Sequence, residues 1–113
     1  MLSSGSRNFD NPLSPEEVHF IDLKVEPWED KSKIKIFVKI SQFLVSPNMN
    51  FYIKNLEAAI LSEVTLIENI DTDLVFTMHL RNYSSQKELI LLGEIFYDNE
   101  IGLVNQKSLT FSL

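Results

Sequence analysis

The two histidines are the residues best suited to acid–base chemistry or metal binding, and their spacing favours neither. His19 and His79 stand about 60 residues apart, and neither belongs to an HxH, HxxxH or HExxH pattern that would bring two imidazoles to one metal ion. His79 shares its parity with Thr77 and Arg81, so we expect an exposed strand histidine. The sequence predicts no metal site and no cofactor.

Other catalytic motifs are also missing. No serine lies in a GxSxG elbow, and the three glycines, Gly5, Gly93 and Gly102, are too widely separated for a GxGxxG or GxxxxGK[ST] loop. The chain has no cysteine, which excludes a disulfide scaffold, a thiolate metal site and a cysteine nucleophile. We therefore predict that the chain is not an enzyme, and an enzyme of unrecognised type is the third hypothesis for its function.

Two acidic turns could supply oxygen ligands. Asp71-Thr-Asp73 and Asp98-Asn-Glu100 would together offer carboxylates to Ca²⁺ if they lay at the same end of the fold. Asp and Asn also cap turns by bonding their own backbone. Solvated turns are the favoured interpretation, and a calcium site is the alternative.

The lysines are unevenly distributed. The chain carries −6 overall, yet the window from Lys31 to Leu56 holds five lysines and no acid, so it is +5 and the rest is −11. An acidic chain is a poor general nucleic-acid binder, because such binding rests on cations at phosphates. Lysines on an outer face or a sheet edge keep strands soluble; the alternative is an acidic protein partner or a second copy of this chain. The candidate partner-binding residues are Lys33, Lys35, Phe37, Lys39, Tyr52 and Lys54.

Aromatic side chains outside the clear inward parity suggest a second function. Exposed rings can stack on sugars or anchor a protein partner, and a carbohydrate-binding module is the alternative to a protein-interaction module. These rings are Trp28, Phe37, Tyr52, Tyr83 and Tyr97. Asn82-Tyr83-Ser84 fits a glycosylation sequon and is interpreted as a turn.

Alternating apolar and polar residues dominate from Glu16 onward, which is typical of strands with one buried face. The parity of apolar residues switches between Phe20 and Ile21, which predicts a β-bulge or a strand that changes sheets. The mostly apolar run 89–97 predicts a central strand covered on both faces, with Gly93 marking a bulge or close packing. The predicted strands are 18–25, 33–40, 49–54, 60–67, 74–81, 89–97 and 104–112.

The segment 55–69 fits two elements. Leu56, Ala59, Ile60 and Val64 recur at helical spacing, whereas residues 60–67 also alternate and include several β-branched side chains. We favour a strand preceded by a hairpin turn at 55–58, although that turn lacks a glycine. The alternative is an α+β fold with a helix at 55–69.

Seven strands with short connections predict an all-β fold, a single antiparallel seven-stranded β-sandwich. This pattern resembles the immunoglobulin and fibronectin type III architecture over residues 16–113. The resemblance is at the level of the fold: the chain has no Cys…Trp…Cys pattern, Trp28 follows the first strand, and a tyrosine corner could fall only on Tyr83.

Residues 1–15 contain four serines and no apolar periodicity, so we expect a flexible N-terminal arm before a β-sandwich domain at 16–113. No signal sequence or apolar membrane span is visible, which predicts a cytoplasmic protein that binds neither membrane nor nucleic acid. The expected function is a non-catalytic interaction or assembly module, with a protein partner or self-association. The predicted core is Phe20, Leu23, Val25, Ile34, Ile36, Val38, Ile40, Phe51, Ile53, Val64, Leu66, Leu74, Phe76, Met78, Leu80, Leu89, Leu91, Ile95, Leu109 and Phe111.

Overall fold

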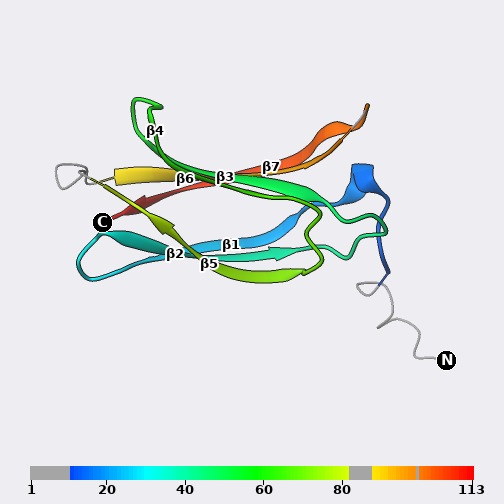
Figure 1. Cartoon of the computed structure of the whole chain (residues 1–113), viewed down its shortest axis with the longest axis horizontal. Helices are drawn as coiled ribbons and strands as arrows, with labels where there is room; N and C mark the ends of the chain where they lie inside the picture. The colour runs from blue at the N-terminus through cyan, green and yellow to red at the C-terminus, as the bar shows by residue number, and fades with distance from the viewer. Residues whose placement is uncertain (1–10, 82–87, 99) are drawn as a thin grey trace.

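A computed structural model describes residues 11–81, 88–98 and 100–113 and shows an all-β sandwich (Figure 1). The described residues form two antiparallel sheets with seven strands and a single 3-10 turn, η2 (Pro15–Glu17). The predicted fold class is confirmed. The strands are β1 (Phe20–Pro27), β2 (Lys33–Ile40), β3 (Asn48–Asn55), β4 (Ile60–Leu66), β5 (Asp73–His79), β6 (Glu88–Tyr97) and β7 (Gly102–Ser112).

The two sheets have the strand orders β1-β2-β5 and β4-β3-β6-β7. Strands β2, β3 and β6 are therefore internal, and β1, β5, β4 and β7 are edges. This order decides between the two positions expected for the lysines of β2: the strand lies between two neighbours, so its lysines lie on an outer face and not at a sheet edge. The ambiguous segment 55–69 contains β4, so the helical alternative is wrong.

The switch in parity near the start of β1 is a β-bulge. The register between β1 and β2 shifts between Phe20 and Asp22, which lets Phe20 and Leu23 both point into the core. The Phe20 N–H donates to the side-chain oxygen of Asn105 on β7 (3.0 Å). The bulge thus joins the edge of one sheet to the edge of the other.

The core lies between the sheets and contains every residue predicted for it, either buried or packed against the buried cluster. Phe51 on β3 lies at its centre, with the ring of Phe20 6.1 Å away and that of Phe76 5.0 Å away between centroids. The buried cluster also contains three side chains that were not predicted: Val18, Met49 and Tyr97. Val18 precedes β1, whereas Met49 and Tyr97 occupy strand ends, where the parity of a short pattern is hardest to assign.

Strand β6 is internal, as predicted, but only one of its faces packs against the other sheet. Its inward positions from Leu89 to Tyr97 are buried, whereas those between them are half-buried on the outer face. Gly93 has no room for a side chain, because a Cβ there would lie 2.9 Å from Cζ of Phe20 and 3.1 Å from Cε1 of Phe51. Of the two alternatives for Gly93, close packing is correct.

The hairpin between β3 and β4 closes without glycine. Ala58 adopts a positive φ of 70°, a conformation that non-glycine residues rarely take. The side-chain oxygen of Asn55 accepts hydrogen bonds from the N–H groups of Glu57 and Ala59, both at 2.9 Å. The asparagine thus holds the turn in place of the usual glycine signal.

Leu13, in the expected arm, is attached to the sandwich. It forms an isolated parallel bridge with Phe43; its N–H donates to the Gln42 carbonyl (3.1 Å), and its carbonyl accepts from Leu44 N–H (3.0 Å). Residues 1–10 lie outside the described part, so the arm as a whole stays a prediction. No helix in the described residues has the length and apolarity to span a bilayer.

Edge strand β7 carries a charged residue on its inner side. Lys107 pairs with Gly93, and positions paired across an antiparallel ladder share a face, so Lys107 has the parity of the core residues Leu109 and Phe111. Its side chain is nevertheless exposed.

Candidate functional site

The six predicted partner-binding residues fall on two surfaces. Lys33, Lys35, Phe37 and Lys39 project from the outer face of β2, because Ile34 and its alternating neighbours point inward. Tyr52 and Lys54 lie on β3, in the other sheet, and project from the outer face of that sheet. The two outer faces of a sandwich point in opposite directions, so no single partner surface contains all six residues.

Carboxylates on neighbouring strands flank the lysines of β2. Glu26 on β1 lies opposite Lys35, and Lys39 lies between Asp22 on β1 and Asp73 on β5. Directly opposed side chains on one face have Cβ atoms about 4.5–5.5 Å apart. The +5 window of the sequence therefore becomes a face of mixed charge once the strands pair.

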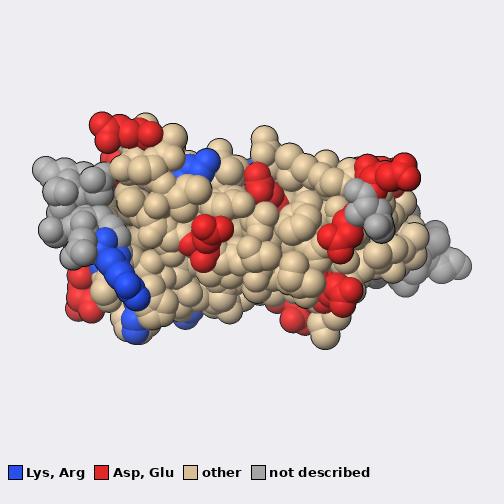
Figure 2. Space-filling model, turned by 45° about the horizontal axis from the view of Figure 1, so that its top comes forward, with Lys and Arg blue, Asp and Glu red and all other residues tan. Residues whose placement is uncertain are grey.

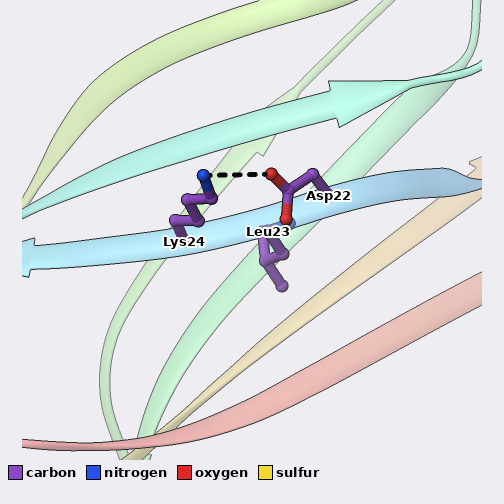
Figure 3. A network of polar contacts seen from close by, with 3 residues as sticks. All are labelled: Asp22, Leu23 and Lys24. Carbon is purple, nitrogen blue, oxygen red and sulfur yellow. Dashed lines mark hydrogen bonds and ion pairs between the residues drawn. The ribbon is translucent and has the colours of Figure 1, made fainter.

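One of these carboxylates, that of Asp22, also contacts two residues of its own strand. Asp22 accepts a hydrogen bond from the Leu23 N–H (3.0 Å) and pairs with Lys24 at 3.5 Å (Figure 3). The two charged side chains are 49% and 70% exposed, for Asp22 and Lys24 respectively, so solvent screens the pair. An open depression of about 510 Å³ beside it reaches Phe37 and Val75, and its rim carries both signs of charge.

The predicted aromatic residues do not form a common platform. Trp28 lies in the β1–β2 turn, Phe37 on one outer face and Tyr52 on the other, Tyr97 is buried, and Tyr83 lies outside the described residues. Each of the first three rings carries a lysine ammonium over it, at 4.4 Å for Trp28, 5.5 Å for Phe37 and 5.8 Å for Tyr52. A sugar would have to displace these cations before stacking on a ring.

Tyr52 lies among polar neighbours. Burial raises the pKa of its phenol, and the nearby carboxylates of Glu94 and Glu63 raise it further. Beside it, the hydroxyl of Thr65 donates to the side-chain oxygen of Asn50 (2.7 Å), and the Asn50 amide donates to Glu94 (3.4 Å). These contacts link three adjacent strands on this face.

Five of the ten exposed large aliphatic side chains in the described residues lie on loops at one end of the sandwich. The loops 41–47, 67–72 and 98–101 all leave strands at this end, because β3 begins beside the ends of β4 and β6, and Lys39 near the end of β2 pairs with Asp73 at the start of β5. We call this the loop end; it is the right-hand end in Figure 1. Its exposed aliphatic residues are Leu44, Val45, Ile67, Ile70 and Ile101, with exposed fractions of 67%, 51%, 63%, 79% and 38%.

Hydrogen bonds hold two of these loops together. The Asn69 N–H donates to the Pro47 carbonyl (2.9 Å), and the Glu68 N–H donates to the Asn48 side chain (2.8 Å). The carbonyl of Thr72 accepts from the Ile40 N–H (2.9 Å). Loops 41–47 and 67–72 are therefore held at several points along their length.

Tyr97, the last residue of β6, contacts loop 41–47. Its hydroxyl donates to the Val45 carbonyl at 2.7 Å, so the end of β6 is attached to loop 41–47. Burial raises the pKa of this phenol, and the carboxylate of Glu16 adds to the effect. Loops 41–47 and 67–72 thus present their exposed aliphatic side chains from a backbone that side-chain and main-chain hydrogen bonds hold in place.

Within the described part of the chain, the loop-end segments carry charges of one sign only, and that sign is negative. Loops 41–47, 67–72 and 98–101 and the segment 11–18 contain no lysine or arginine. Figure 2 shows carboxylates at both ends and in the middle of the visible face, whereas the lysine and arginine side chains visible there lie away from the loop end. The exposed carboxylates in these segments are Glu16, Glu17, Glu68, Asp71, Asp98 and Glu100.

The two acidic turns do lie at this common end, yet within the described part of the chain no three metal-ligating side chains come together. The histidines are also separate. His79 is exposed on β5, as expected, and pairs with Lys33, whereas Nδ1 of His19 lies 2.8 Å from the carbonyl of Glu17.

The comparisons with known proteins show a fold. No family model and no curated protein sequence matches the chain. Two solved structures of a β-glucuronidase from Ruminococcus gnavus match it: the apo enzyme with a TM-score of 0.49 and the complex with D-glucaro 1,5-lactone with 0.50. Each is 7% identical over 86% of this chain, which spans 16% of that enzyme. The chain therefore resembles a β-sandwich part of a glycoside hydrolase.

The loop end was not predicted from the sequence. Its aliphatic residues are dispersed over about 60 positions and follow no periodicity, because each loop contributes only one or two of them. A usable signal exists in retrospect: large apolar residues inside segments that otherwise read as turns, such as Ile70 between Asn69 and Asp71, are candidates for exposed contacts.

Proposed function

We propose that this chain is a non-catalytic, immunoglobulin-like interaction module that binds a protein partner at its loop end. The observation that carries the proposal is that five exposed aliphatic side chains lie on three loops that leave the sandwich at one end. Exposed apolar residues scattered singly need no explanation, whereas a group of them on one surface is typical of an interaction site.

The rigidity of the loops supports the same function. Binding is weakened by the entropy lost when loops become ordered, and loops already held in place lose less. The hydrogen bonds to Val45, Pro47 and Thr72 described above supply this order before any partner arrives. The aliphatic side chains of loops 41–47 and 67–72 therefore project from backbone that is already ordered in the free protein.

The strand order supports the immunoglobulin-like part of the proposal. In the constant-type sandwich, strands A, B and E share one sheet and C, F and G share the other. Here β1, β2 and β5 form one sheet, and β3, β6 and β7 belong to the other. The fourth strand, β4, joins β3. In such sandwiches, loops gathered at one end of the domain are the part that variable domains use for binding.

The sugar-binding alternative has less support. It would draw on the likeness to a part of a β-glucuronidase and on exposed aromatic rings, but the rings lie on separate surfaces under lysine side chains. Glycan arrays test it directly. Specific glycan binding that Trp28→Ala or Tyr52→Ala abolishes would replace the proposal of a protein partner.

Photo-crosslinking tests the location of the site. A photoreactive phenylalanine analogue replaces Ile70 at the loop end in one protein and Val75 on the outer face of β5 in its matched control; both positions are exposed and aliphatic. In cells of the source organism, we expect a discrete crosslinked product from position 70 alone.

Val75 is an informative control because it pairs with Phe37 on the outer face of β2. We call this surface, which carries Lys33, Lys35 and Lys39, the lysine face. A product from position 75 alone would move the binding site to that face. Products from neither position would remove the support for a protein partner.

A further inference from the structure

We infer that the partner at the loop end is a protein segment in which aliphatic side chains alternate with lysine or arginine. The inference rests on the proposed function and adds the chemistry of the partner to it. The inference is carried by the combination of exposed aliphatic side chains with carboxylates at the loop end. A partner that covers this surface must both contact the aliphatic side chains and balance the negative charge.

Carboxylates lie beside aliphatic side chains in two of the three loops, 67–72 and 98–101, whereas loop 41–47 contributes only apolar and uncharged polar side chains. Glu68 and Asp71 adjoin Ile67 and Ile70, and Glu100 precedes Ile101. A partner with only apolar residues would desolvate these carboxylates without compensation, which costs free energy. A partner with only cations would leave the aliphatic side chains in water. An alternating cationic and aliphatic segment meets both requirements.

A hollow beside the β6–β7 turn shows how such a segment could be held. It is an open depression of about 460 Å³, lined by Glu16, Glu100, Ile101, Leu103 and Val104. Lysine and arginine bury apolar stems while keeping the charged head in a polar setting. A partner cation whose stem lies on Leu103 and Val104 would have its head near the carboxylates of Glu16 and Glu100.

The same charges argue against other occupants. Six carboxylates repel an anionic bilayer and a nucleic-acid backbone, both of which attract cations. A second copy offers the lysines of β2 as its cationic surface, but there Asp22, Glu26 and Asp73 lie among them. A partner segment free of acidic residues complements the loop end better.

The test uses three synthetic peptides of equal length: alternating leucine and lysine, alternating leucine and glutamate, and alternating serine and lysine. Backbone amide signals of the ¹⁵N-labelled protein are followed by NMR during each titration. We expect the leucine–lysine peptide to shift signals of loops 41–47, 67–72 and 98–101 and to bind more weakly as salt is added. The other two peptides are expected to bind at least about tenfold more weakly, since each lacks one half of the recognition.

Variants assign the effect to the surface. Ile67→Ser with Ile70→Ser should abolish the loop-end shifts, and Glu16→Gln with Glu100→Gln should weaken binding about threefold to tenfold, as exposed charge pairs of this kind contribute. The matched controls are Val75→Ser and Glu26→Gln on the outer face of β1-β2-β5. They should leave binding unchanged.

Several outcomes overturn the inference. Equal binding of the leucine–glutamate peptide, shifts confined to the outer face of β1-β2-β5, or no binding by the leucine–lysine peptide would each do so. Sedimentation with phosphatidylserine vesicles would favour a lipid partner instead. If the crosslink at position 70 persists while the peptides fail, the proposed function stands and only the chemistry of the partner is wrong.

Discussion

Gly93 on β6 stands against two phenylalanine rings, and the sandwich leaves no space for a methyl group there. In Gly93→Ala the new Cβ would lie 2.9 Å from Cζ of Phe20. Overpacking of this kind costs about 1–3 kcal/mol of the free energy of unfolding. Chemical denaturation should show that loss, and Phe20→Leu in the same chain should recover part of it. An unchanged midpoint for Gly93→Ala would show that the rings move aside freely.

Tyr97 is a second residue whose effect can be isolated. Tyr97→Phe removes the hydrogen bond to the Val45 carbonyl and should lower the free energy of unfolding by about 1 kcal/mol. Amide exchange of loop 41–47 should become faster in the variant. If exchange in that loop is unaltered, the hydroxyl does not hold the loop.

The same phenol makes stability depend on alkaline pH. Burial raises the folded-state pKa of Tyr97 above the ordinary value of about 10. The folded state then binds the proton more tightly than the unfolded state, so this contribution is complete below pH of about 10 and is lost as pH rises through the folded-state pKa. Tyr97→Phe should therefore lose less stability than the wild type above pH of about 10. Tyr52→Phe is the comparison, because the pKa of Tyr52 is raised as well.

At the scale of elements, the β3–β4 hairpin contains a strained residue that can be relieved. A left-handed conformation costs an L-residue about 1–2 kcal/mol, and Ala58 adopts one. Ala58→Gly should stabilise the domain by up to about 1 kcal/mol, after the extra freedom of glycine in the unfolded chain is subtracted. Ala59→Gly, one position later with no positive φ, should destabilise it slightly. A lower melting temperature for Ala58→Gly would contradict this account.

Strands were predictable from the sequence because alternation reports burial directly. Lys33 to Ile40 shows the pattern without interruption, and the switch at Phe20 revealed a bulge, since one extra residue exchanges the two faces. The turn at Asn55 could be located but not explained, because its stability depends on a side-chain hydrogen bond. Burial at the ends of β3 and β6 was harder to predict from the sequence, and the buried side chains of Met49 and Tyr97 were not predicted.

At the scale of the whole molecule, charge was the least predictable property. The window from Lys31 to Leu56 indicated a basic stripe, but strand pairing places carboxylates beside it. Glu26, 9 residues before Lys35, lies opposite that lysine, and Asp73, 34 residues after Lys39, lies opposite Lys39. The candidate site at the loop end was missed for a related reason. Both depend on which distant segments become neighbours, and local periodicity carries no information on that.

Self-association through the lysine face is a whole-molecule prediction that can now be tested more carefully. Lys35→Glu would place a carboxylate opposite Glu26 and cost about 0.2–1 kcal/mol by itself, so Lys33→Gln with Lys35→Gln is the better variant. If this face joins two copies, sedimentation velocity should show a dimer at low salt that salt and the variant both dissociate. A wild-type monomer at every salt concentration would eliminate that mode of assembly.

Lys107 has a consequence for the behaviour of the protein at high concentration. Strand β7 is long and pairs on one side only, so its free backbone is a template on which another chain could add a strand and begin a fibril. A charged side chain on the inner side of an edge strand would have to be buried by such an addition. Lys107→Val should leave the free energy of unfolding nearly unchanged while shortening the lag before thioflavin-positive aggregates form. The exposed Lys107 would then be the residue that keeps this sandwich from polymerising.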